Sequence, residues 1–164
     1  MHSRRSVLIA SFAAPLPLLP QTTTERPAAV EQALVKEFVI AGHNDLEKVQ
    51  TMLAARPALL NATWDWGGGD FETALGGASH MGRRDIALFL IEKGARLDMF
   101  AAAMLGKVDI LKAALAAFPD IHKSLGPHKI PMIAHARKGG EDALAVVKLL
   151  ETYQAASASA ISIG

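Results

Sequence analysis

The stretch TALGGASHMGRRDIALFLIEKGA, residues 73–95, decides the fold. It runs from Thr73 through small residues to Gly82. Asp85 and a second, longer apolar segment follow. Gly82 can take a positive φ and end a first helix, and Asp85 places negative charge where the free N–H groups of a second helix begin. The stretch therefore predicts a helix pair.

The same unit recurs along the chain. The glycine-to-aspartate offset of three residues appears again from Gly42 to Asp45 and from Gly106 to Asp109, and a looser copy covers residues 139–142. Apolar residues follow each aspartate at helical spacing, so each second helix has one apolar face. A single helix pair cannot bury that face alone, and the copies are therefore expected to stack on one another.

Residues 73–95 resemble the ankyrin repeat, with its T-P-L-H opening, long second helix and G-A ending. Ala74 stands in the place of the usual proline and Gly76 in that of the histidine that links neighbouring repeats. The resemblance extends over residues 31–152, with an insertion at 61–71, and only the interval of 33 residues from Gly106 to Gly139 equals the family's period. It implies an all-α fold, an ankyrin-like α-solenoid of about four helix-turn-helix repeats over residues 31–153. A non-repetitive helical bundle is the alternative.

The two ends of the chain differ from this pattern. Arg4 and Arg5 precede an apolar run, the order found in export signals, and the pair resembles the twin-arginine motif. We expect an export signal over residues 1–24, a linker over 25–30 and a periplasmic or secreted protein. The alternative is a frayed cytoplasmic N-terminus. The alanine- and serine-rich tail, residues 154–164, has no periodic apolar face and is expected to be disordered.

Composition excludes several classes of function. The chain has no cysteine, which rules out disulfides, thiolate metal sites and a cysteine nucleophile. Loss of residues 1–24 would remove Arg4 and Arg5 but no acid, and would leave 15 basic against 16 acidic side chains. Such a near-neutral chain does not attract phosphate backbones, so nucleic acid is not expected as a partner. The apolar run is also too short and too proline-rich for a stable membrane anchor. We expect a monomer.

The insertion between the first two repeats holds the best candidate binding residues. Both tryptophans of the chain lie there, next to three glycines and two acids, and tryptophan is favoured in binding hot spots. The ankyrin resemblance implies a finger-like turn here, beside a concave face. We predict a protein–protein interaction module whose partner contacts Trp64, Asp65, Trp66, Asp70, Glu72 and His80. Alternatively, the tryptophans fill a gap left by the irregular repeats.

The sequence contains no nucleophile motif and no tight metal-ligand spacing, so no enzymatic activity, cofactor or metal is assigned. For each histidine a capping or hydrogen-bonding role is the more common one. A small-ligand or metal-binding protein, hydrolytic in one version, is the second hypothesis. Its pocket would combine the tryptophan segment with Glu72, His80 and His135, and its metal version requires His80 to approach Glu72 or Asp65.

Overall fold

The computed structural model describes residues 27–161. The predicted export signal lies outside this range. The described residues are mostly helical, as expected, and contain one two-stranded β-sheet that was not expected. The elements are α1 (Gln32–Gly42), α2 (Leu46–Ala55), β1 (Thr63–Asp65), β2 (Phe71–Thr73), α3 (Ala74–Met81), α4 (Arg84–Glu92), α5 (Met99–Met104), α6 (Val108–Ala117), α7 (Met132–Lys138) and α8 (Leu144–Ile161).

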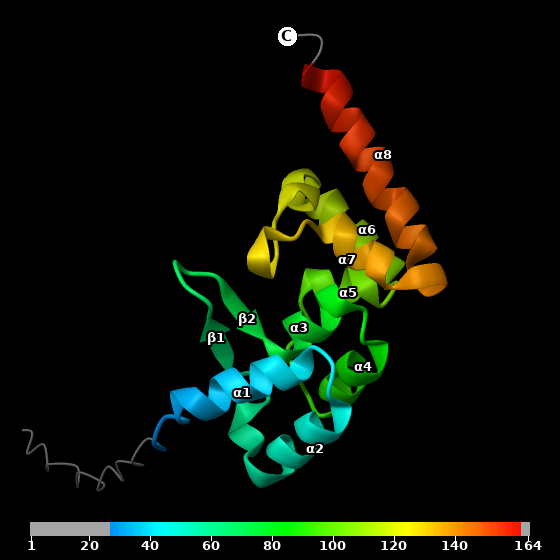
Figure 1. Cartoon of the computed structure of the whole chain (residues 1–164). Helices are drawn as coiled ribbons and strands as arrows, with labels where there is room; N and C mark the ends of the chain where they lie inside the picture. The colour runs from blue at the N-terminus through cyan, green and yellow to red at the C-terminus, as the bar shows by residue number, and fades with distance from the viewer. Residues whose placement is uncertain (1–26, 162–164) are drawn as a thin grey trace, which may run out of the picture.

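The α-helices follow one another in pairs along the chain (Figure 1). The first helices of successive pairs pack side by side, α1 against α3, α3 against α5 and α5 against α7. Among the second helices, α2 contacts α4 and α6 contacts α8. Most helix contacts therefore join elements that are near one another in the sequence.

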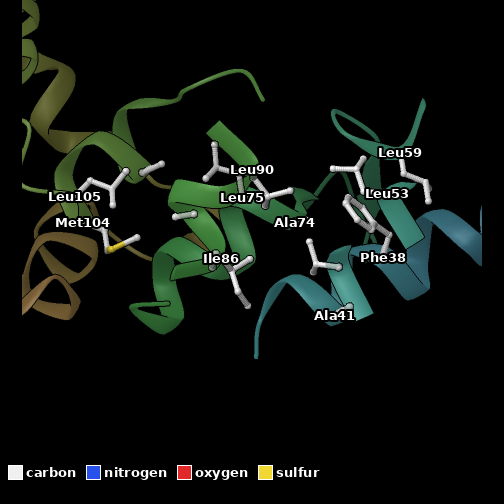
Figure 2. Close-up of a cluster of buried hydrophobic side chains, with 14 residues drawn as sticks. Phe38, Ala41, Leu53, Leu59, Ala74, Leu75, Ile86, Leu90, Met104 and Leu105 are labelled. Carbon is white, nitrogen blue, oxygen red and sulfur yellow. The ribbon is translucent and has the colours of Figure 1, made fainter. Parts of the chain in front are cut away.

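Two groups of buried apolar side chains form the core. The first spans α1 to α5 and includes Phe38, Leu75 and Met104 (Figure 2). The second spans α5 to α8 and includes Leu111 and Met132. Helix α5 contributes to both groups, since its alanines at 101, 102 and 103 are all fully buried. The short, alanine-rich α5 thus lets the helices on both sides approach it closely.

Aspartate and threonine side chains cap the N-termini of three helices. Asp45 accepts a hydrogen bond from the Lys48 N–H at the start of α2, and Asp98 accepts one from the Ala101 N–H at the start of α5. Thr73 does the same for the Gly76 N–H at the start of α3. These caps satisfy backbone donors that have no partner within the helix, and they confirm the helix start expected at Asp45.

The glycines that end the first helices differ in their role. Gly82 and Gly106 have φ values of 76° and 72°, so the prediction of left-handed helix ends is confirmed there. It is wrong at Gly42, which belongs to α1, and in the looser copy the positive φ, 64°, falls on Gly140 instead of Gly139. A Cβ at Gly42 would lie 2.5 Å from the Ala74 carbonyl oxygen. Close packing of α1 against α3, rather than a positive φ, requires glycine at that position.

The C-terminal segment corrects another expectation. Helix α8 continues to Ile161, so the prediction of disorder is wrong for residues 154–161. Alanine has the highest helix propensity of all residues, and an alanine-rich segment extends an existing helix at little cost. The Ser157 hydroxyl also lies 3.2 Å from His122 Nε2, so this part of α8 contacts the segment between α6 and α7.

Two irregular segments lie on one side of the row of helices. Strands β1 and β2 form an antiparallel hairpin in which Trp64 pairs with Glu72. The connector between α6 and α7, residues 118–131, contains two 3-10 helices, Pro119–Lys123 and Pro127–Lys129. Figure 1 shows the hairpin and this yellow connector projecting to the same side. Among the described helices, none combines the length and apolar character needed to cross a bilayer.

Candidate metal centre

Four side chains from distant parts of the chain converge beside the hairpin. They are His43, Glu72, His80 and His128, and one nitrogen or carboxylate oxygen of each lies within 4.8 Å of the others. His80 Nε2 is 2.9 Å from Glu72 Oε1 and 3.2 Å from His43 Nε2. His43 Nε2 and His128 Nε2 lie 3.4 Å and 3.5 Å from Glu72 Oε2. Three imidazoles thus surround one buried carboxylate.

Local structure fixes the orientation of each group. His43 directly follows α1, and its Nδ1 lies 2.9 Å from the Val39 carbonyl oxygen. Glu72 lies on β2, where its side chain is fully buried and its Oε2 accepts a hydrogen bond from Trp66 Nε1. His80 lies in the last turn of α3. The end of one helix, the hairpin and the next helix therefore bring three of the four groups together.

Two glycines in α3 make room for the cluster. A Cβ at Gly77 would lie 2.7 Å from His43 Nδ1 and 2.8 Å from its Cε1. A Cβ at Gly76 would lie 3.3 Å from Glu72 Cγ. Glycine inside a helix costs about 1 kcal/mol relative to alanine. The two glycines thus lower the stability of α3 near its start, and they leave the space that the His43 ring occupies.

Asp70 holds the fourth group in place. Its carboxylate accepts a hydrogen bond from the His128 backbone N–H and another from His128 Nδ1, each 2.8 Å long. His128 and the following Lys129 both have a φ of 57°, a left-handed conformation that non-glycine residues adopt at a cost in energy. Such backbone strain concentrates at functional sites. The Asp70 contacts compensate the strain and set the direction of the His128 ring.

The hydrogen bonds also determine which ring nitrogens carry protons. A carbonyl or carboxylate oxygen only accepts, so Nδ1 of His43, facing Val39, and Nδ1 of His128, facing Asp70, are the protonated nitrogens. In a neutral ring the opposite nitrogen, Nε2, then carries a lone pair. Both Nε2 atoms face Oε2 of Glu72, which also carries lone pairs. Protons added to these nitrogens, or a metal ion between these atoms, would remove the unfavourable contact between lone pairs.

Three of the distances within the cluster are close to those between the ligands of a metal ion. Ligands at about 2.0–2.1 Å from an ion lie about 3.3–3.4 Å apart in tetrahedral geometry. The Nε2 atoms of His80 and His43 are 3.2 Å apart, which is close to this value. The same holds for Oε2 of Glu72, which lies 3.4 Å from His43 Nε2 and 3.5 Å from His128 Nε2. The tautomers of His43 and His128 also present Nε2 in the form that metals bind. The arrangement can therefore hold a divalent ion.

The electrostatics of the two acids favour their charged forms. Burial opposes ionisation of Glu72, but hydrogen bonds from His80 and Trp66 and the nearby His43 outweigh it and hold the pKa of Glu72 below its usual value. The hydrogen bond from the His128 backbone N–H is the largest factor that lowers the pKa of Asp70. Both carboxylates are therefore ionised at neutral pH, which a metal site requires.

His135, a member of the pocket in the second hypothesis, does not join the cluster. Its side chain is fully buried, and its Nδ1 donates to the Pro131 carbonyl oxygen 3.2 Å away. Its Nε2 has no hydrogen-bond partner among the described residues. Burial lowers the pKa of His135. The neutral His135 ring packs against Phe100 and beside His80, at centroid distances of 5.0 Å and 6.4 Å.

The hairpin residues proposed for partner binding have mostly internal contacts. Trp66 donates to Glu72, and its ring lies edge-on to His43. Trp64 is half-buried beneath the Lys36 ammonium group, which lies 5.2 Å from the ring centroid. Asp65 accepts hydrogen bonds from the N–H groups at 67 and 69 and so closes the glycine turn. These contacts stabilise the hairpin and place Trp66 beside the histidine cluster.

Sequence reasoning selected Glu72, His80 and Asp70 and missed His43 and His128. The requirement for a metal site, that His80 approach Glu72, is met. His43 and His128 follow no metal-binding spacing, and only the packing of α1 on α3 and the path of the connector bring them to Glu72. The consecutive glycines at 76 and 77 were the available signal, because glycine inside a helix implies that something packs closely against it.

Comparisons with known proteins identify no relative. A scan against protein-family models finds no match for this chain, and searches of curated proteins and of solved structures find none either.

Proposed function

We propose that this chain is an ankyrin-like helical-repeat protein that binds a divalent transition-metal ion among His43, Glu72, His80 and His128. The observation that carries the proposal is the convergence of three Nε2 atoms on one buried carboxylate. Hydrogen bonds of Nδ1 turn the His43 and His128 lone pairs toward Glu72. Buried lone pairs that face one another are unfavourable unless a cation lies between them.

The ligand atoms select the class of ion. Imidazole nitrogens suit Zn²⁺, Cu²⁺, Ni²⁺ and Fe²⁺, whereas Mg²⁺ and Ca²⁺ prefer an all-oxygen set. The cluster offers three nitrogens and one carboxylate. Nδ1 of His128 donates a hydrogen bond to Asp70, and Nδ1 of His43 donates one to the Val39 carbonyl oxygen. Histidines that bind a metal use such contacts of the second ring nitrogen to fix their tautomer. We therefore propose Zn²⁺ or a similar first-row ion.

Metal titration tests this function. We expect the metal-free protein to bind one Zn²⁺ or Co²⁺ per chain in calorimetry, with no response to Mg²⁺. An ion that binds only the folded state stabilises it, by about 2.7 kcal/mol at a free concentration 100 times the Kd, so the thermal midpoint should rise on addition of Zn²⁺. His122→Ala, which removes a histidine outside the cluster, should bind with the affinity of the unmodified protein. Absence of saturable Zn²⁺ and Co²⁺ binding would overturn the proposal.

The repeat architecture is part of the same proposal. Successive helix pairs pack on their neighbours, as repeats in a solenoid do, and the hairpin lies where the family has its projecting turn. In this arrangement His43 and His80 end the first helices of adjacent pairs. The metal would then join neighbouring repeats, the role that the usual ankyrin histidine, replaced here by Gly76, has through hydrogen bonds. Export to the cell envelope, predicted from residues 1–24, remains part of the proposal.

Binding of a protein partner is the second candidate function, and two exposed apolar side chains favour it. Phe71 and Leu125 are 60% and 56% exposed, and both line one cleft with Phe100 and Pro127. Partners that bury such side chains gain affinity from them. Since Trp64 and Trp66 have internal contacts, Phe71 is the better residue to test.

Affinity capture from envelope extracts tests the partner. We expect Phe71→Ala to recover at least about fivefold less partner than the unmodified chain, the effect of losing a contact worth about 1 kcal/mol. Phe118→Ala is the matched control, because Phe118 is at least as exposed, at 69%, but lies outside this cleft. Equal recovery with both variants would contradict the role of this surface.

A further inference from the structure

The cluster is most open to solvent at His128. The side chains of Glu72, His80 and His43 are 0%, 10% and 20% exposed, whereas that of His128 is 35% exposed. His128 and Asp70 line a cleft of about 610 Å³ together with the glycine run 67–69, Leu125 and Lys129. An ion in the cluster would therefore meet small molecules from the His128 side.

His128 is also the least integrated member of the cluster. His43, His80 and Glu72 form a compact triangle of side chains, in which His80 Nε2 lies 2.9 Å from Glu72 Oε1 and 3.2 Å from His43 Nε2, and His43 Nε2 lies 3.4 Å from Glu72 Oε2. Nε2 of His128 approaches that triangle at Glu72 Oε2, 3.5 Å away, and comes from the connector instead of the helix row. Two histidines and one glutamate are a known ligand set for catalytic zinc, which keeps its fourth position for water.

Asp70 and His128 form a second functional unit beside the triangle. The carboxylate fixes the Nδ1–H tautomer, so that Nε2 of His128 is free to accept a proton on the side that faces the triangle. A carboxylate that orients a histidine in this way is the arrangement found in general-base catalysis. The strained backbone at 128 and 129 holds that nitrogen at the mouth of the cleft.

We propose, on the basis of the metal-binding function above, that His43, His80 and Glu72 hold the ion, that a water molecule occupies its fourth position, and that the Asp70–His128 pair activates this water to hydrolyse a small ester or amide in the cleft. The size of the cleft suits low-molecular-mass substrates. Leu125 and the glycine run offer an apolar wall and space for the acyl group, and Lys129 adds a positive charge at the rim.

The reaction balances with water as the only co-reactant. The metal-bound water transfers one proton to Nε2 of His128, and the resulting hydroxide forms a bond to the substrate carbonyl carbon. The bond between that carbon and the ester oxygen or amide nitrogen of the leaving group then breaks. His128 returns its proton to the leaving group, and the products are a carboxylic acid and an alcohol or amine. Glu72, His43 and His80 hold the ion throughout.

The experiment separates a catalytic base from a metal ligand. The full chain and its His128→Gln variant are titrated with Co²⁺ and followed by visible absorption, then tested with azide and with 4-nitrophenyl acetate. We expect His128→Gln to retain Co²⁺ affinity within about threefold and the azide-induced spectral change, but to lose about 100- to 10,000-fold in ester hydrolysis, the contribution of a general base. Asp70→Asn should lower hydrolysis in the same direction, and His122→Gln should leave it unchanged.

Three results would overturn the inference. A loss of Co²⁺ affinity of tenfold or more in His128→Gln would make His128 a ligand and the site closed, and the metal-binding function would stand. A Co²⁺ spectrum that azide does not alter would show that no position is exchangeable. Equal hydrolysis by the unmodified chain and His128→Gln would remove the base. If the unmodified chain binds no Co²⁺, the metal-binding function fails with it.

Discussion

Gly77→Ala is expected to abolish metal binding and to leave the protein folded. The added Cβ would lie 2.7 Å from Nδ1 and 2.8 Å from Cε1 of His43, so the ring must leave its position against the Val39 carbonyl. With His43 displaced, the ion loses one of its ligands. The loss of affinity should exceed the about 10- to 100-fold that changes in the outer contacts of a metal site cost.

Gly76→Ala is the matched control for this prediction. It adds the same methyl group one residue earlier in α3, where the nearest atom is Glu72 Cγ at 3.3 Å. Both alanines gain about 1 kcal/mol of helix propensity, so differences between the variants report on the cluster. Zn²⁺ calorimetry and far-ultraviolet circular dichroism are the measurements. If Gly77→Ala binds Zn²⁺ as tightly as Gly76→Ala, His43 is not a ligand.

Gly139→Ala is expected to have the largest effect on stability. A Cβ at this position would lie 2.0 Å from the Met104 carbonyl oxygen and 2.7 Å from the Ala143 Cβ. The nearest obstacle is backbone, so α5 and α7 would have to separate, and these two helices are neighbours in the core. We expect a loss of about 3 kcal/mol or more in the free energy of unfolding, at the upper end of overpacking effects.

The neighbouring glycine provides the comparison. Gly140 has a φ of 64° and nothing within 4 Å of an added Cβ, so Gly140→Ala should cost only the about 1–2 kcal/mol of a left-handed alanine. Urea unfolding of both variants in the presence of EDTA measures the difference without contributions from bound metal. A smaller loss for Gly139→Ala than for Gly140→Ala would contradict the close approach of the two helices.

The sequence predicted the helical architecture better than the candidate site. Periodic apolar faces, the cap at Asp45 and the left-handed glycines at 82 and 106 are local signals, and the structure confirms them. The hairpin was missed because its strands have three residues each, too few for an alternating pattern. The extension of α8 was missed because the tail has no apolar periodicity, although its alanines favour a helix.

The site depends on contacts that no local pattern encodes. Glu72 and His80 were selected because they lie near the tryptophans, yet their role depends on His43 and His128, which come from other segments. His43 reaches the cluster through a helix-to-helix distance that Gly77 permits. His128 reaches it through the Asp70 contacts. Neither distance can be derived from residue spacing, since both depend on how the pairs pack.

The wide separation of His43, Glu72 and His80 along the chain has a consequence for how the protein unfolds. In a linear array of small packed units the terminal ones can open while the rest stay closed. An ion held by the segment after α1, the hairpin and α3 would bind these parts only when all are in place. In a chain without cysteine, such an ion would act as a reversible crosslink, and it would make the array from residue 43 to residue 80 melt as one cooperative block.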